Sequence, residues 1–157
     1  MPVRPVPEGY STVTPYLIVA DAAAAIDFYT RAFGAQELMR FGDPDGKIMH
    51  AELQIGDSRI MLADEAPQMG YRGPLALGGS AISIMLYVPD VDRVFNRAIE
   101  AGASTQQALK DQFYGDRSGT VIDPFGHVWT IATHVEDVSE EEMRRRMESS
   151  TPAHASS

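Results

Sequence analysis

An internal repeat constrains the fold of this chain more than any other feature. Leu17 lies in a run rich in β-branched and aromatic residues, and Leu86 lies in a similar run 69 positions later (86 − 17 = 69). Asp21 and Asp90, which keep the same spacing, each follow their run and suit the N-cap of a helix. A strand, a cap and a helix that recur in one order at a constant period predict two copies of one supersecondary unit.

Each predicted helix carries an apolar stripe and ends at a glycine. In the first copy Ala25, Ile26, Tyr29 and Phe33 fall on one helical face, and Gly34 stands at the C-terminal end. The second copy repeats this pattern. Each helix is therefore expected to pack on a sheet through one side only.

The second half of each copy predicts a β-hairpin. Residues 114–134 hold two strand-like runs separated by the sequence Asp-Pro-Phe-Gly at 123–126. Proline fixes φ and glycine accepts a positive φ, so this tetrapeptide favours a tight turn. Phe-Gly-Asp at 41–43 resembles Tyr-Gly-Asp at 114–116 and marks the matching half of the first copy. The repeated unit is therefore predicted to be strand–helix–strand–strand–strand, or βαβββ.

The predicted fold class is α+β, with two βαβββ modules that form an open, barrel-like cup and carry their helices on the outer face. Ser139 with Glu142 fits a capping box and predicts a short helix after the second module. The predicted organisation is an N-terminal arm at 1–12, a first βαβββ module at 13–65, a connecting loop at 66–80, a second βαβββ module at 81–134, a C-terminal helix at 135–148 and a disordered tail at 149–157.

Alternation with period two divides each predicted strand into an apolar face and a mixed face. In the middle strand of the first module, Met49 is placed with the apolar residues, and Ile48 is placed with His50 and Glu52 on the mixed face. The two mixed faces are expected to line one small-molecule cavity, with few polar groups among apolar walls. The predicted lining residues are Tyr16, His50, Glu52, Arg59, Met61, Ser83, Met85, Tyr87, Tyr114 and Thr130.

Composition and motifs exclude several function classes. The formal net charge of −9 and the isoelectric point near 4.8 argue against binding to nucleic acid or to an anionic membrane. The absence of cysteine excludes thiolate catalysis, disulfides and cysteine-ligated zinc. We find no apolar run long enough for a membrane span and no signal-peptide pattern, so a cytoplasmic protein without a membrane partner is expected. P-loop, GxSxG and GxGxxG motifs are also absent.

Several of these segments resemble one family. The two βαβββ units, each with an Asp-capped helix that ends in glycine, resemble the vicinal oxygen chelate superfamily of glyoxalase I, extradiol dioxygenases and bleomycin-binding resistance proteins. Residues 48–53, 61–65 and 114–138 resemble its PhnB-like branch. The resemblance covers most of the chain, from residue 12 to residue 148, and implies a homodimer that binds a small molecule.

The same resemblance bears on metal binding. Metal enzymes of this superfamily take His, Gln or Glu ligands from the first and last strands of each unit, positions that fall here on Thr14, Met61, Ser83 and Thr130. Hydroxyls and a thioether are poor ligands for a divalent metal. No cofactor is therefore expected at these four positions. A displaced divalent metal at His50 and Glu52, with a third ligand from His134 or Asp43, stays an open alternative.

Three functional hypotheses follow. The first is a metal-free, bleomycin-resistance-like protein that binds a small, planar organic molecule against aromatic walls. The second is a lyase, isomerase or dioxygenase that uses His50 and Glu52, through a divalent metal or as an acid–base pair in which burial raises the pKa of Glu52. The third is a non-catalytic structural or interaction protein whose cavity its own side chains fill. Sequence leaves open whether the chain is an enzyme, and whether the modules pair within one chain or between two.

Overall fold

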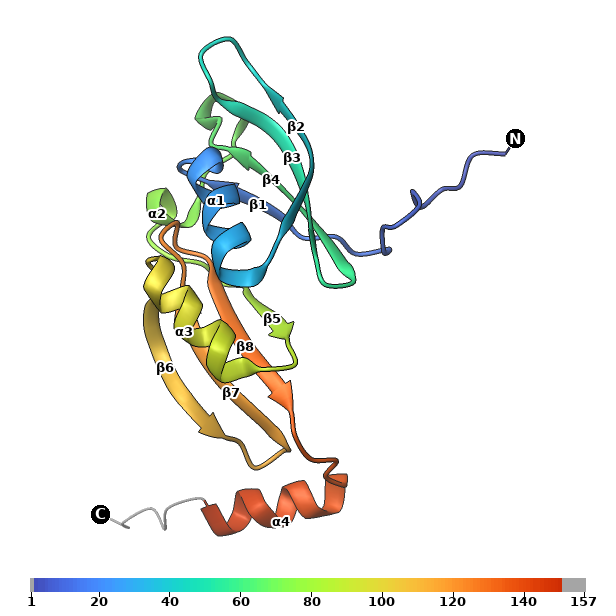
Figure 1. Ribbon diagram of the computed structural model, residues 1–157, viewed down its shortest axis with the longest axis vertical. Helices are drawn as coiled ribbons and strands as arrows, with labels where there is room; N and C mark the ends of the chain where they lie inside the picture. The colour runs from blue at the N-terminus through green and yellow to red at the C-terminus, as the bar shows by residue number, and fades with distance from the viewer. Residues whose placement is uncertain (1, 151–157) are drawn as a thin grey trace.

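The first module, in the computed structural model of residues 2–150, is a four-stranded sheet covered by one helix (Figure 1). The strand order is β1-β4-β3-β2, with β1 parallel to β4 and the other neighbours antiparallel. Its elements are β1 (Tyr16–Val19), α1 (Ala22–Phe33), β2 (Gln36–Gly42), β3 (Ile48–Ile55) and β4 (Ser58–Asp64).

The second module repeats the same topology. Its strand order is β5-β8-β7-β6, again with one parallel pair, β5 with β8. Its elements are β5 (Ser83–Tyr87), α3 (Val91–Ala101), β6 (Ser104–Asp111), β7 (Asp116–Ile122) and β8 (Val128–His134). The predicted α+β class with two βαβββ modules is therefore confirmed, and the two sheets do not close into a barrel.

Both repeated aspartates cap their helices. The side chain of Asp21 accepts from the backbone N–H of Ala24 at 3.1 Å, and that of Asp90 accepts from Arg93 at 3.2 Å. Gly34 adopts φ 71° at the end of α1, a left-handed conformation that favours glycine. The local signals in the sequence thus set where each helix starts and stops.

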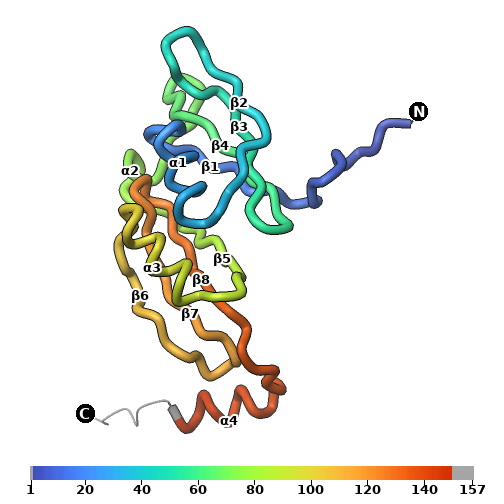
Figure 2. The backbone as a smooth tube through the Cα atoms, in the orientation of Figure 1, coloured from blue at the N-terminus to red at the C-terminus, as the bar shows by residue number. Residues whose placement is uncertain are grey.

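The two helices pack against each other and join the cores of the modules. Figures 1 and 2 show the sheets lying end to end along the long axis of the molecule, with α1 beside α3. Each sheet therefore buries one face under its helix and leaves the other face open. The largest fully buried side chains are Trp129, Tyr29, Phe28, Leu53, Leu62, Ile131, Val19 and Val121.

A β-bulge overturns one predicted face. The pairing of β2 with β3 passes from Phe41 with His50 to Gly42 with Ile48, so Met49 is the unpaired residue. Ile48 is consequently buried, at 2 % exposure, while Met49 is 66 % exposed. A one-residue slip moves side chains to the opposite face of a strand, so strict alternation placed this pair wrongly.

The connecting segment contains two short helical turns, η1 (Pro67–Met69) and α2 (Pro74–Leu77). The C-terminal helix α4 (Glu140–Ser150) begins later than predicted, because residues 135–139 form neither helix nor strand. Helix α4 includes residues 149 and 150, and the rest of the predicted tail, 151–157, lies outside the described residues. No helix within residues 2–150 is long and apolar enough to cross a membrane.

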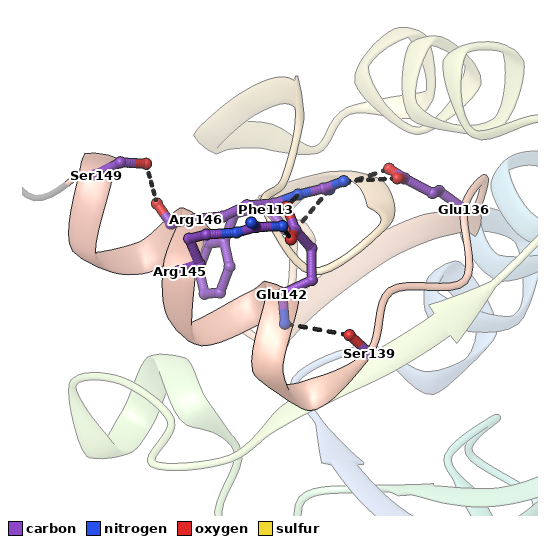
Figure 3. A network of polar contacts seen from close by, with 7 residues as sticks. All are labelled: Phe113, Glu136, Ser139, Glu142, Arg145, Arg146 and Ser149. Atoms are coloured by element: carbon purple, nitrogen blue, oxygen red, sulfur yellow. Dashed lines mark hydrogen bonds and ion pairs between the residues drawn. The ribbon is translucent and has the colours of Figure 1, made fainter.

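One arginine anchors α4 to the second module (Figure 3). Arg146 forms an ion pair of 2.7 Å with Glu136 and donates to the backbone carbonyl of Phe113 at 3.2 Å. The hydroxyl of Ser139 accepts from the N–H of Glu142 at 3.1 Å, which is the N-terminal half of the predicted capping box.

Candidate functional site

A chain of hydrogen bonds crosses the open face of the first sheet. The Tyr16 hydroxyl lies 2.8 Å from His50 Nδ1, and His50 Nε2 lies 2.8 Å from Glu52 Oε2. The hydroxyl of Tyr10 donates to Glu52 Oε1. Strand register brings Tyr16 and Glu52 together because both pair with Met61 on β4, whereas Tyr10 reaches Glu52 from the N-terminal arm. We call Tyr10, Tyr16, His50 and Glu52 the first polar network.

The hydrogen bonds of this network set its charges. A His50 tautomer with its proton on Nε2 satisfies both neighbours, because it accepts from Tyr16 and donates to Glu52. Hydrogen bonds from Tyr10 and His50 lower the pKa of Glu52, whereas burial and the bond to Glu52 raise the pKa of Tyr10 to about 12. The predicted net rise in the pKa of Glu52 is therefore wrong, because hydrogen bonds to the carboxylate outweigh the effect of burial.

Arg59 extends the first polar network at the β3–β4 hairpin. Its Nε donates to Gln54 Oε1 at 2.9 Å, and its guanidinium lies 5.0 Å from the centroid of the Tyr10 ring. A third contact joins Arg59 Nη1 to the backbone carbonyl of Glu8 at 3.3 Å. The cation therefore faces the N-terminal arm as well as the predicted cavity face.

The second sheet carries a comparable chain, which we call the second polar network. The Tyr87 hydroxyl donates to Asp116 Oδ2 at 2.8 Å, and Asp116 Oδ1 lies 2.7 Å from His134 Nδ1. His134 Nε2 lies 2.7 Å from Asp137 Oδ1. Asp116 is only 3 % exposed, and its hydrogen bond raises the pKa of Tyr87. Tyr114 lies in the β6–β7 connection, where its negative form would further raise the pKa of Tyr87.

The second polar network predicts that the attachment of the segment after β8 depends on pH. Hydrogen bonds to Asp116 and then Asp137 raise the pKa of His134 above the ordinary value of 6.5. The stabilisation that protonated His134 gives to the folded state is therefore complete below about pH 6.5. It is lost as the pH rises through the folded-state pKa of His134. We expect residues 135–139 to lose protection from hydrogen exchange over that range, once intrinsic exchange rates are corrected. A His134→Gln variant should show no such change, and an equal pH dependence in both proteins would contradict the assignment.

The remaining predicted residues divide between the two modules. Met61 pairs with Tyr16 on the first open face. On the second, Met85 pairs with Thr130, whose Oγ1 lies 2.9 Å from Oγ1 of Thr120. Ser83 begins β5 opposite Val128 and is exposed. Within residues 2–150, Arg59, Met85 and Tyr87 line one cavity and Tyr16 lines another, so neither of these cavities brings all ten residues together.

A crevice of about 780 Å³ does lie at the junction of the modules. Residues of the β3–β4 hairpin, the N-terminal arm and β5 line it, among them the predicted site residues Arg59, Met85 and Tyr87. Apolar side chains also line it, including Phe33, Ile84, Leu86, Val94 and Trp129. A second cavity of about 200 Å³ lies beside Tyr16, between the first sheet and η1. The crevice falls within the size range of small-molecule sites, and the second cavity is smaller than that range.

The candidate ligands His50, Glu52, Asp43 and His134 do not fit one divalent metal. Within residues 2–150, no group of three or more His, Asp or Glu side chains is placed to hold one. His50 and Glu52 bond each other, and the proposed third ligands lie elsewhere. Asp43 accepts from backbone N–H groups of its own turn at 2.9 and 3.0 Å, and His134 is bonded on opposite ring nitrogens by carboxylates that cannot share one ion.

Comparison with known proteins agrees with the fold. Residues 11–131 match the family model described as the glyoxalase/bleomycin resistance protein/dioxygenase superfamily. The chain belongs to this superfamily. The predicted superfamily resemblance is thereby confirmed, and a PhnB protein from Bacillus cereus shares the fold at 19 % identity and a TM-score of 0.60, covering 78 % of this chain and 99 % of that one.

Closer superfamily relatives cover most of the chain. An uncharacterized Mycobacterium tuberculosis protein, Rv0887c, is 49 % identical over 140 residues, which is 87 % of this chain and 82 % of the relative. TioX from Micromonospora is 31 % identical with a TM-score of 0.62, covering 80 % of this chain and 99 % of TioX. Protein PA1353 from Pseudomonas aeruginosa is 28 % identical with a TM-score of 0.63, at 80 % and 99 % coverage.

Sequence reasoning missed Tyr10 and Asp116 as site residues. Tyr10 lies in the arm, outside any periodic segment, and nothing in the sequence connects it to Glu52. Asp116 had a usable signal, because the tight turn at residues 123–126 pairs Ile122 with Val128 and, counted back, Asp116 with His134. Hairpin register alone would therefore have predicted this Asp–His pair.

Proposed function

We propose that this superfamily member binds a small, planar organic molecule on its open sheet faces without the divalent metal of the family's enzymes. One observation carries the proposal: aromatic and thioether side chains stand exposed on both open faces beside the polar networks. Tyr16 and Met85 are each 47 % exposed, and Tyr87 is 59 % exposed. Exposed apolar residues beside a few convergent polar groups are typical of an incomplete ligand site.

The proposal includes a homodimer that completes the cup. In one chain the modules touch through α1 and α3, so the open faces do not lie against each other. An open face from one protomer placed against that of its partner covers the exposed aromatic residues of both. A two-fold axis then generates two equivalent cups, each with Tyr16 from one protomer and Tyr87 from the other.

A second candidate function is acid–base catalysis through the first polar network. Glu52 orients His50, and His50 Nδ1 faces the Tyr16 hydroxyl at 2.8 Å, which is the geometry of a base with its positioning carboxylate. Tyr16 would then be the group that exchanges a proton with the bound molecule. The structural-protein hypothesis is less favoured, because an open crevice of about 780 Å³ remains between the modules.

Mixing two variants with weakened binding tests the ligand site and the dimer together. With the neutral planar dye Nile red as probe, we expect Tyr16→Ala and Tyr87→Ala each to lower affinity by about tenfold. After subunit exchange about half of the dimers are mixed, and each mixed dimer contains one intact cup. About a quarter of all sites should therefore regain wild-type affinity. Val3→Ala, on the exposed arm, is the matched control, and titrations with and without EDTA should agree. Recovery of no sites would contradict a cup shared between chains, and loss of binding in EDTA would contradict the metal-free site.

A further inference from the structure

The N-terminal arm places one side chain on the first open face. Every residue from Pro2 to Gly9 is exposed, as are residues 11–13, whereas Tyr10 is half-buried. The arm forms neither a helix nor a strand in this region. Its attachment to the sheet is therefore concentrated at Tyr10 and the turn just before it, where the N–H of Tyr10 donates to the carbonyl of Pro7 at 3.0 Å.

Tyr10 is held at both ends of its side chain. Its hydroxyl donates to Glu52, and its ring lies under the Arg59 guanidinium, 5.0 Å from the ring centroid. Gly9 permits this approach: it adopts φ 84°, and a Cβ there would lie 2.4 Å from Arg59 Cζ. Glu8 adds a backbone carbonyl that accepts from Arg59 at 3.3 Å. A cation over an aromatic face and a carboxylate at its hydroxyl together match the chemistry of a phenol.

The groups that receive Tyr10 are positioned by the sheet and not by the arm. Glu52 is fixed by His50 at 2.8 Å, and Arg59 is fixed by Gln54 at 2.9 Å. All four residues belong to β3 and β4. The acceptor and the cation therefore stay in place when Tyr10 leaves, and a preorganised site costs a ligand little conformational entropy.

We propose that Glu52 and Arg59 form a subsite for an aromatic hydroxyl group, and that the chain's own Tyr10 occupies this subsite until a phenolic ligand displaces it. The inference rests on the proposed ligand-binding function and narrows its ligand class to planar phenols. The arm is suited to leave because no strand pairing holds residues 2–13 and their side chains, Tyr10 apart, lie in solvent. Bound phenol and docked arm are mutually exclusive, since both require the same carboxylate oxygen and the same cation face.

Self-occupation lowers the apparent affinity for a ligand by the fraction of molecules in which the site is free. If Tyr10 fills the subsite in about nine molecules of ten, its removal should tighten phenol binding by about tenfold. The probe is p-cresol, which copies the tyrosine side chain, and toluene is its counterpart without the hydroxyl. Binding is followed in the full-length protein by the amide NMR shifts of β3 and β4.

We expect Tyr10→Ala to bind p-cresol about tenfold more tightly than the wild type, with no matching gain for toluene. Tyr10→Phe, which keeps the ring and removes the hydroxyl, should give a smaller gain and guards against an unfolded alanine variant. Adding Glu52→Gln to Tyr10→Ala should abolish the preference for p-cresol over toluene. Val6→Ala, in the same arm, should leave p-cresol affinity unchanged.

Equal or weaker p-cresol binding in Tyr10→Ala would overturn the inference and make Tyr10 a wall of the site. Equal gains for toluene would show an apolar surface and not a phenol subsite, which also overturns it. These outcomes are separable from failure of the proposed function, because p-cresol binding needs only the first module's face. The Nile red test, in contrast, needs both modules and two chains.

Discussion

Asp123→Ala is expected to lower the free energy of unfolding by about 3–5 kcal/mol, because it leaves four buried or half-buried donors without their charged acceptor. Asp123 is 3 % exposed. Its Oδ2 accepts from the Tyr29 hydroxyl at 2.5 Å and from Trp129 Nε1 at 2.9 Å. Tyr29 belongs to α1 and Trp129 to β8, so one carboxylate oxygen joins the two modules. Burial, together with the charge and the hydrogen bond of Asp123, raises the pKa of Tyr29 well above its usual range.

Asp43 provides a matched control for the part of this effect that comes from the turn. Asp123 Oδ1 accepts from the N–H groups of Phe125 and His127 at 2.9 and 3.0 Å, and Asp43 Oδ1 accepts from Asp45 and Lys47 at the same two distances. Asp43 lacks the bonds to a second module. Asp43→Ala is therefore expected to cost about 1–2 kcal/mol.

Urea unfolding followed by the fluorescence of the single tryptophan measures both variants. If Asp123→Ala does not fold, Asp123→Asn is the second variant, since its amide replaces one acceptor oxygen and should cost about 2–3 kcal/mol. Equal losses of unfolding free energy in the Asp123 and Asp43 variants would contradict a stabilising bond between the modules at Asp123.

Gly115→Ala is expected to detach the segment that leads to α4 and to destabilise the protein by about 3 kcal/mol or more. Gly115 adopts φ 101°, and a Cβ there would lie 2.1 Å from the backbone oxygen of Glu136. The carbonyl of Gly115 also accepts from the N–H groups of Val135 and Glu136, at 2.9 and 3.1 Å. An added methyl group therefore pushes away the strand end that these two bonds hold.

Gly46→Ala separates this contact from backbone strain. Gly46 has a similar positive φ of 87°, yet nothing lies within 4 Å of its ideal Cβ. Its substitution should cost only the left-handed strain of a non-glycine residue, about 1–2 kcal/mol. Hydrogen exchange should show lost protection at residues 135–150 in Gly115→Ala alone. Retained protection there, with equal stability losses in the two variants, would refute the close-approach argument.

The sequence predicted the modules well because their signals are local. Asp21 and Asp90 cap helices through bonds within three residues, and the Asp-Pro-Phe-Gly turn fixes the register of its own hairpin. The face alternation that follows placed Tyr16, His50 and Glu52 together, since side chains two residues apart share a strand face. It failed at Met49 because a bulge depends on the partner strand, which the local pattern does not contain.

The placement of the predicted site residues depends on tertiary contacts. Sequence assigned residues from both modules to one cavity, whereas in one chain the two polar networks stay on separate open faces. Packing decides this arrangement: the contact of α1 with α3 and the bond of Tyr29 to Asp123 orient the modules, and both join residues far apart in the sequence. The charge of Glu52 was likewise decided by a tertiary contact, because Tyr10 reaches it from a segment without periodicity.

The sequence by itself therefore determined the two βαβββ units, their caps and turns, and the superfamily. Each of these depends on residue types at short spacing or on the period of the repeat. Only the tertiary structure decided how the modules sit together, which groups set each pKa and what lies on the first open face. Those properties depend on distances between remote segments, which the free energy of packing fixes and no local pattern records.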